Sequence, residues 1–221
     1  MKRFWRHNGL SVTLLGFFLV FLVAQGLTGW RAESNELKEH HRPGIGLGKY
    51  LTSGAFLEAT MENWESEFLQ MAAYVIFTTF LYQRGSAESK DPEKNEAVDR
   101  DPRESREKID APGPVRAGGW RLWLYERSLS FALLALFLIS FILHGVGGAW
   151  ACSEERALHG EPAIGVLAYM RSSAFWFESF QNWQSEFLAI GAMVVLSIFL
   201  RQRGSAESKP VDSPHHSTGS G

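Results

Sequence analysis

Apolar positions gather in four segments of the chain, each followed by polar sequence. The segments cover about residues 10–30, 63–83, 129–149 and 182–202. A helix needs about 20 residues to cross roughly 30 Å of hydrocarbon. Each segment reaches that length and ends at polar or charged residues, so the pattern predicts four transmembrane helices.

The second and fourth segments share the same motifs at both ends. Residues 63–90 read NWESEFLQMAAYVIFTTFLYQRGSAESK, and residues 182–209 read NWQSEFLAIGAMVVLSIFLRQRGSAESK, at a constant offset of 119. Aligned without insertion, residues 4–90 and 123–209 are identical at 37 of 87 positions. The sequence therefore contains a tandem repeat of a two-helix unit.

The repeat predicts an all-α membrane protein built from two helical hairpins. Because each unit contains two spans, both hairpins enter the membrane in the same direction, and a pseudo-twofold axis runs along the membrane normal. Residues 1–90 form the first repeat and residues 120–209 the second. The charged stretch 91–119 and the tail 210–221 lack large apolar runs, so we expect a flexible linker and a disordered tail.

The first apolar segment has a second interpretation. A basic start followed by an apolar run also resembles a cleavable signal peptide. The run over residues 10–30 is longer than an ordinary signal sequence core, and its counterpart at 129–149 lies in the middle of the chain. We therefore expect a retained transmembrane helix.

Lysine and arginine residues cluster at one end of each predicted span. They occur near residues 2–6, 84–90, 116–127 and 201–209, whereas the loops at the opposite ends mix acidic and basic residues. The positive-inside rule then places both termini and the linker in the cytoplasm. The tryptophans lie near the ends of the spans, as in an aromatic belt at the membrane surfaces.

Overall composition hides this pattern, because polar segments dilute the apolar ones. The 221 residues are 45% apolar with a net charge of −2. No basic patch interleaved with aromatic residues occurs, so we expect no nucleic-acid partner. The single cysteine, Cys152, excludes an internal disulfide and a cysteine zinc cage. Without a catalytic or cofactor-binding motif, the sequence predicts no enzyme activity and no cofactor.

One candidate site is a polar stripe on the second and fourth spans. Asn63 and Glu67 are four residues apart, as are Asn182 and Glu186, so each pair shares a helix face. In one interpretation Glu67 and Glu186 meet and form a cation or proton site. In the other they are solvated at headgroup level, which we favour because acids this close to a span's end reach water.

His144 is the only histidine inside a predicted span, and Gln25 occupies the matching position in the first copy. It could act as a proton relay or ligand group, but an interhelical hydrogen bond is favoured because Gln25 could also make one. Histidines and glutamates at 36–41, with His159 and Glu155, have ligand chemistry but no established metal-site spacing. No metal site is therefore predicted.

The octapeptide Gln-Arg-Gly-Ser-Ala-Glu-Ser-Lys ends both copies unchanged. Its glycine suits a left-handed helix C-cap, and its arginine suits the helix dipole and anionic headgroups. The other identities predict a shared contact with lipid phosphate, with the other copy or with a cytoplasmic partner. The residues expected to make it are Gln83, Arg84, Gly85, Gln202, Arg203 and Gly204.

Asn-Trp-x-Ser-Glu-Phe-Leu, an apolar span and this octapeptide together resemble a family of small bacterial membrane proteins known only as a domain of unknown function. The resemblance covers residues 4–90 and 123–209. It implies a bacterial inner-membrane location and brings no activity, substrate or catalytic residue.

The sequence thus predicts a structural, interaction or accessory protein of the bacterial inner membrane. Its expected partners are the lipid bilayer, including anionic lipids, and a second copy of itself or another membrane protein. A small channel or transporter using Glu67, Glu186 and His144 is the alternative. An intramembrane enzyme is the third possibility.

Overall fold

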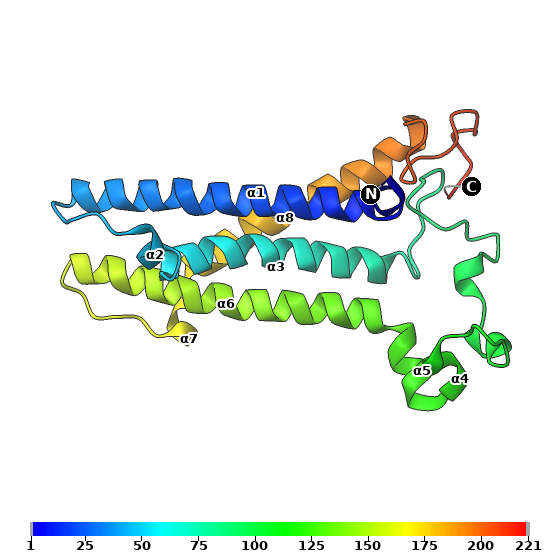
Figure 1. The fold of residues 1–221 in the computed structure, drawn as a ribbon, viewed down its shortest axis with the longest axis horizontal. Coiled ribbons are helices and arrows are strands. Elements are labelled where there is room, and N and C mark those ends of the chain that lie inside the picture. The colour runs from blue at the N-terminus through cyan, green and yellow to red at the C-terminus, as the bar shows by residue number, and fades with distance from the viewer. Residues whose placement is uncertain (1, 220–221) are drawn as a thin grey trace. The chain divides into compact units, whose positions relative to one another are not determined.

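The computed structural model describes residues 2–219, which contain helices and no strand (Figure 1). The all-α class is confirmed for these residues. The long helices are α1 (Lys2–Glu39), α3 (Gly54–Phe77), α6 (Ser128–Leu158) and α8 (Ser173–Phe199). The short ones are α2 (Leu47–Tyr50), α4 (Gly113–Ala117), α5 (Gly119–Glu126), α7 (Val166–Tyr169) and 3-10 helices at Ala97–Asp99 and Pro102–Ser105.

Three long helices, α1, α6 and α8, are long and apolar enough to cross a membrane. The apolar side chains of α1 are largely exposed, for example Leu14 at 60% and Phe21 at 65%, as lipid-facing residues would be. Helix α3 is not among the three in the described part of the chain. It contains four glutamates between residues 58 and 67, Glu58, Glu62, Glu65 and Glu67, which lower its hydropathy.

The chain divides into two compact units. The first consists of Met1–Met61 and Ile142–Phe175, and the second consists of Glu62–Phe141 and Trp176–Gly221. Helices α3, α6 and α8 each contribute one part to each unit.

Matching serines begin α3 and α8. The Phe56 N–H donates to Ser53 Oγ and the Phe175 N–H to Ser172 Oγ, each at 3.3 Å. A serine oxygen in this position satisfies one of the first backbone donors of a helix. Ser53 and Ser172 are therefore the N-caps of α3 and α8.

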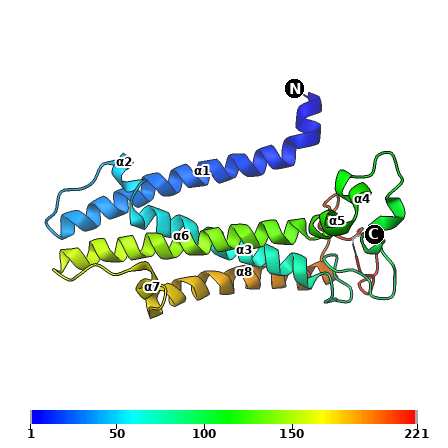
Figure 2. The same ribbon diagram turned by 90° about the horizontal axis from the view of Figure 1, so that it is seen from below.

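In the first unit, α1 and α6 are each followed by an extended segment that returns to a short helix, α2 or α7 (Figures 1 and 2). The helix-breaking run Pro43–Gly46 lies in the first of these segments. Serine hydroxyls hold both segments: Ser34 donates to the Ile45 carbonyl and Ser153 to the Ile164 carbonyl, each at 3.3 Å. Matching positions of the two sequence copies thus make matching contacts.

The second unit contains the predicted linker. Ala111, Val115 and Leu122 form a small buried apolar cluster there. Lys90 also makes an ion pair with Asp99 at 2.5 Å. The flexibility expected of residues 91–119 and 210–221 stays a prediction.

Two helical glycines leave room for the tyrosines of the short helices. A Cβ on Gly29 would lie 2.1 Å from Tyr50 Oη, and one on Gly148 would lie 2.2 Å from Tyr169 Cε1. Real Cβ atoms do not approach other atoms so closely, so each tyrosine requires a glycine opposite it.

We predict that Gly148→Ala lowers the free energy of unfolding by about 1–3 kcal/mol, because the methyl group overpacks the Tyr169 ring. Unfolding of the detergent-solubilised protein in SDS measures this change. Gly191→Ala is the matched control, since its Cβ would meet no described atom within 4 Å. It should be neutral or stabilise the helix by up to about 1 kcal/mol, and equal losses in both variants would contradict the packing argument.

Candidate functional site

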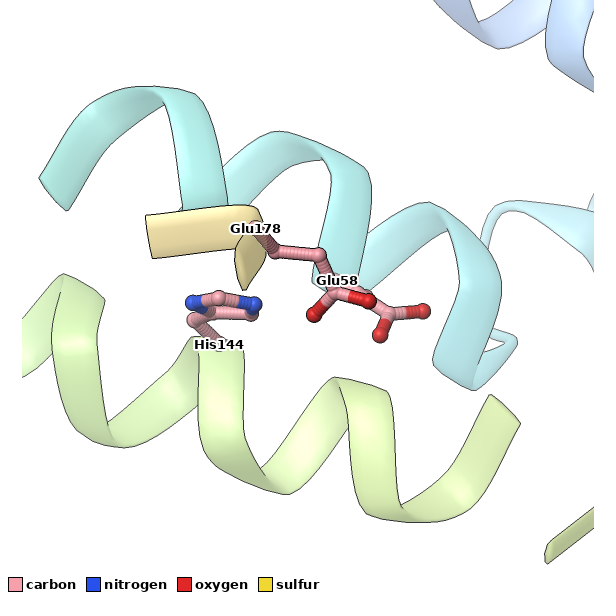
Figure 3. Close-up of side chains that lie close together, drawn as sticks. All are labelled: Glu58, His144 and Glu178. Carbon is pink, nitrogen blue, oxygen red and sulfur yellow. The ribbon is translucent and has the colours of Figure 1, made fainter. Parts of the chain in front are cut away.

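In the first unit, the buried His144 of α6 lies close to Glu58 of α3. His144 has no exposed surface, and Glu58 is half-buried. Their ligand-capable atoms lie within 4.8 Å of one another. In Figure 3 the His144 side chain projects from α6 toward α3, the helix that carries Glu58. An imidazole and a carboxylate side by side can share a proton or bind a cation.

Glycines bring α3 and α6 together at this point. A Cβ on Gly147 would lie 2.5 Å from the backbone nitrogen of Glu58, and one on Gly148 would lie 2.5 Å from Glu58 Oε1. Small residues allow helix backbones to approach this closely in a membrane. The absence of a side chain at Gly147 and Gly148 therefore leaves the room that Glu58 occupies against α6.

Two aromatic residues orient the pair. The Tyr169 hydroxyl donates to Glu58 Oε1 at 2.6 Å. The Phe175 ring stacks on His144, with centroids 4.6 Å apart and the planes 30° apart. Tyr169 and Phe175 also contact each other edge to face at 5.8 Å. Tyr169 thus orients the Glu58 carboxylate, and Phe175 orients the His144 imidazole.

Helix α8 contains a further carboxylate near its start. Glu178 follows Phe175 by three residues, so the two side chains project from the same helix face. Glu178 is half-buried. It is the third residue labelled in Figure 3.

The matching position of the first copy uses neutral groups. Gln25 of α1 donates from Nε2 to Thr60 Oγ1 of α3 at 3.3 Å. The interhelical hydrogen bond expected for Gln25 is therefore present. Gln25 matches His144 in the sequence repeat, while Glu58 matches Phe177 and has no acidic twin. Only the second copy's position combines an imidazole with a carboxylate.

A second group of buried acids lies in the second unit, between α3 and α8. Glu65 is fully buried and accepts hydrogen bonds from Ser179 Oγ at 2.8 Å and Trp183 Nε1 at 3.2 Å. Asn182 donates from Nδ2 to Glu62 Oε1. These bonds satisfy carboxylates that would otherwise be costly to bury.

The residues expected to form the polar stripe differ in their exposure to solvent. Asn63 and Glu67 are exposed, whereas Asn182 and Glu186 are half-buried. The described structure thus leaves the first pair in solvent and the second pair partly covered, and the meeting of Glu67 with Glu186 stays a prediction.

Sequence reasoning missed Glu58, Glu62 and Glu65. Their spacing of four and then three places them on one face of α3, which is a readable helical signal. The repeat does not mark these positions, because Glu58 corresponds to Phe177 and Glu65 to Gln184.

The repeated octapeptide forms the same turn twice. The Gln83 N–H donates to Ser89 Oγ, and the Gln202 N–H donates to Ser208 Oγ, each at 2.9 Å. The glycines are left-handed as predicted, with φ of 84° in the first copy and 85° in the second. Their assignment as helix C-caps is wrong, because α3 and α8 end several residues earlier, at Phe77 and Phe199.

The two turns differ in what covers them. In the first, the Gly85 N–H donates to Thr218 Oγ1 at 3.0 Å and the Gly219 N–H donates to the Ser86 carbonyl at 2.9 Å. The second turn is exposed at Gln202, Arg203 and Gly204, which line a shallow hollow. The chain's own tail therefore occupies one copy of the turn and leaves the other accessible.

Lys209 holds the tail in place. Its ammonium group is buried and donates to the carbonyls of Gly85, His215 and Ser217 at 2.5, 3.1 and 2.9 Å. Burial lowers the pKa of Lys209 below its usual range, and the charge of Arg201 adds to this effect. The tail's position thus depends on one cation surrounded by backbone oxygens.

We predict that Lys209→Met releases the tail, because the methionine cannot donate to these carbonyls. Amide hydrogen exchange should then accelerate for residues 210–219 and for the Gly85 N–H. The control is Lys90→Met, which removes the partly exposed ion pair with Asp99 and the contact of the ammonium group with the Tyr82 ring. Unchanged exchange at Gly85 in Lys209→Met would contradict this arrangement.

The chain belongs to the family defined by a domain of unknown function, DUF6766, which matches residues 1–220. No curated protein and no solved structure matches the chain.

Proposed function

We propose that this chain is an interaction or accessory protein of the bacterial inner membrane, with four spans and both termini in the cytoplasm. The three apolar helices and the family of unknown function support a membrane protein. Helix α3 would be the remaining span, since it occupies in the first sequence copy the position of α8 in the second.

The glutamates of α3 are compatible with such a span. Glu65 is directed at donors of α8, and Glu62 accepts from Asn182 of the same helix. Carboxylates that accept hydrogen bonds inside a helix bundle need not face lipid. The low hydropathy of α3 would then reflect buried polar contacts. Duplication of one helical hairpin would account for two hairpins that enter the membrane in the same direction.

The contrast between the two octapeptide turns is the observation that supports an interaction role. Both have the same backbone turn, but a peptide segment already occupies the first. That segment offers a hydroxyl acceptor, Thr218, to a glycine N–H, and a backbone donor, Gly219, to a serine carbonyl. In the second turn Gln202, Arg203 and Gly204, the counterpart of Gly85, are exposed to solvent.

The proposed partner is therefore an extended, hydroxyl-bearing peptide segment on the cytoplasmic side of the membrane. It would accept from the Gly204 N–H, as Thr218 accepts from that of Gly85. The exposed guanidinium of Arg203 would add attraction for an acidic residue of that segment. No catalytic step is needed for such a role.

Site-specific photo-crosslinking in bacterial membranes tests this proposal. A photoreactive residue at Arg203 of the full-length chain should yield one discrete protein adduct, and the same residue at Arg84 should not, because the tail occupies that turn. Gly204→Val should abolish the adduct, since the left-handed turn disfavours a β-branched residue. Lipid adducts alone, or identical adducts from both positions, would contradict a peptide partner.

The membrane arrangement makes a separate prediction. Reporters fused at the N-terminus and after Lys90 should both be cytoplasmic, and one inserted at His159 should lie on the opposite side. Cysteine labelling in intact cells checks the same positions without a large fusion. An external reporter after Lys90 would contradict four spans in two parallel hairpins.

A small cation channel is the second candidate function. It rests on Glu67 and Glu186, which occupy matching positions of the sequence repeat, because acids that line a pathway through a membrane attract cations. Ion flux into proteoliposomes that disappears in the double variant Glu67→Gln, Glu186→Gln would support this candidate over the first.

A further inference from the structure

We propose that an open hollow beside α4 and α5 binds an anionic phospholipid. The volume of this hollow is about 570 Å³, and its lining includes Pro114, Ala117, Trp120, Arg121, Leu124 and Tyr125. All of these residues belong to the second unit, as does the first part of α6. The inference uses the membrane location of the chain and is independent of the peptide contact proposed for residues 202–209.

Helix α5 has a buried side and an exposed aromatic side. Leu122 is buried in the small apolar cluster of this unit. Trp120, Trp123 and Leu124 are spaced by three and one residues, so they share another face of the helix. Trp120 is 71% exposed and Trp123 is 52% exposed. Indole rings prefer the headgroup level of a bilayer, so this face of α5 suits the boundary between hydrocarbon and water.

Arginines give the same region a positive charge. Residues 113–128 contain three arginines and one glutamate, which is a net charge of +2. Glu126 pairs with Arg127 at 3.1 Å, so the excess charge lies on Arg116 and Arg121, which are both exposed. A guanidinium group can donate two parallel hydrogen bonds to a phosphate. The charge and the donor geometry therefore suit a phosphate-bearing anion.

Cation–π contacts place two guanidinium groups over the exposed rings. The Arg121 guanidinium lies 5.7 Å from the centroid of the Trp120 ring. That of Arg127 lies 5.0 Å from the centroid of the Trp123 ring. The attraction between a cation and an indole face holds both groups beside the aromatic surface. Phosphate donors and apolar surface are thus available to one ligand.

The hollow reaches the apolar start of α6. Ser128, the first residue of α6, also lines the hollow, and the next residue, Leu129, is exposed. Figures 1 and 2 show α4 and α5 at this end of α6. Helix α6 is long and apolar enough to cross a membrane. When α6 spans the bilayer, the hollow therefore lies at headgroup depth, and the acyl chains of a bound lipid lie along α6.

These features favour a phospholipid over other ligands. A soluble phosphate would contact the arginines but leave the aromatic surface exposed to water. A lipid without net charge would leave the positive charge uncompensated. An anionic phospholipid complements both, because it joins a phosphate to apolar chains. A basic side chain next to a transmembrane helix strengthens binding to anionic lipid by about fivefold.

Native mass spectrometry of the full-length protein in detergent tests the site. Phosphatidylglycerol is the anionic probe, and phosphatidylcholine is the probe without net charge. We expect one tightly bound phosphatidylglycerol per chain, at concentrations at which phosphatidylcholine is not retained. Arg121→Gln should weaken phosphatidylglycerol binding by about fivefold, and the double variant Arg116→Gln, Arg121→Gln by at least about tenfold.

The matched control is Arg100→Gln, which removes the same charge from the linker. Arg100 is exposed and donates to the Ala97 carbonyl, outside the hollow. It should leave phosphatidylglycerol binding unchanged. Equal retention of both lipids by the parent protein, or equal losses in Arg121→Gln and Arg100→Gln, would overturn the proposal. Displacement of the lipid by soluble glycerol 3-phosphate at equal concentration would also overturn it, in favour of a free phosphate site.

Photo-crosslinking in bacterial membranes identifies the ligand class directly. A photoreactive residue at Leu124, which lines the hollow, should yield phospholipid adducts. The same residue at Ile109, an exposed apolar position of the linker, should not. Protein adducts in place of lipid adducts at Leu124 would contradict a lipid ligand. A negative result at Arg203 would leave these outcomes unaffected, so the two proposals fail separately.

Discussion

Hydrogen bonds to the carboxylates of α3 are the interaction on which the rest of this structure depends. A carboxylate among apolar helices is tolerated only where neighbouring groups replace the water it loses. Tyr169 does so for Glu58, and Ser179 and Trp183 do so for Glu65. These donors lie on α7 and α8, so the acids of one helix determine which residues its neighbours must present.

The structure also depends on the close approach of helix backbones at glycines. Gly147 and Gly148 allow Glu58 to lie against α6, and Gly29 and Gly148 each face a tyrosine ring of the short helices. The attraction between helices in lipid comes from packing and polar contacts, not from excluding water. Glycine and carboxylate therefore act together, because a hydrogen bond between helices requires that the backbones come close first.

The two copies of the sequence repeat have diverged in their polar chemistry. The first copy joins α1 to α3 through Gln25 and Thr60, while the second places His144 against Glu58. The octapeptides remained identical and form one turn geometry, yet only the first turn is covered by the tail. The first copy thus has a neutral polar contact and a covered turn. The second copy has an ionisable contact and an exposed turn.

Much of the local structure followed from the sequence alone. Apolar runs determined that the chain is helical, Ser53 and Ser172 determined where two helices begin, and Pro43–Gly46 determined where one cannot continue. Tertiary structure alone decided that Glu58, Glu62 and Glu65 are turned inward and which groups donate to them. Helix starts and stops depend on neighbouring residues in the chain, whereas the burial of a charge depends on donors more than 100 residues away, whose positions only packing decides.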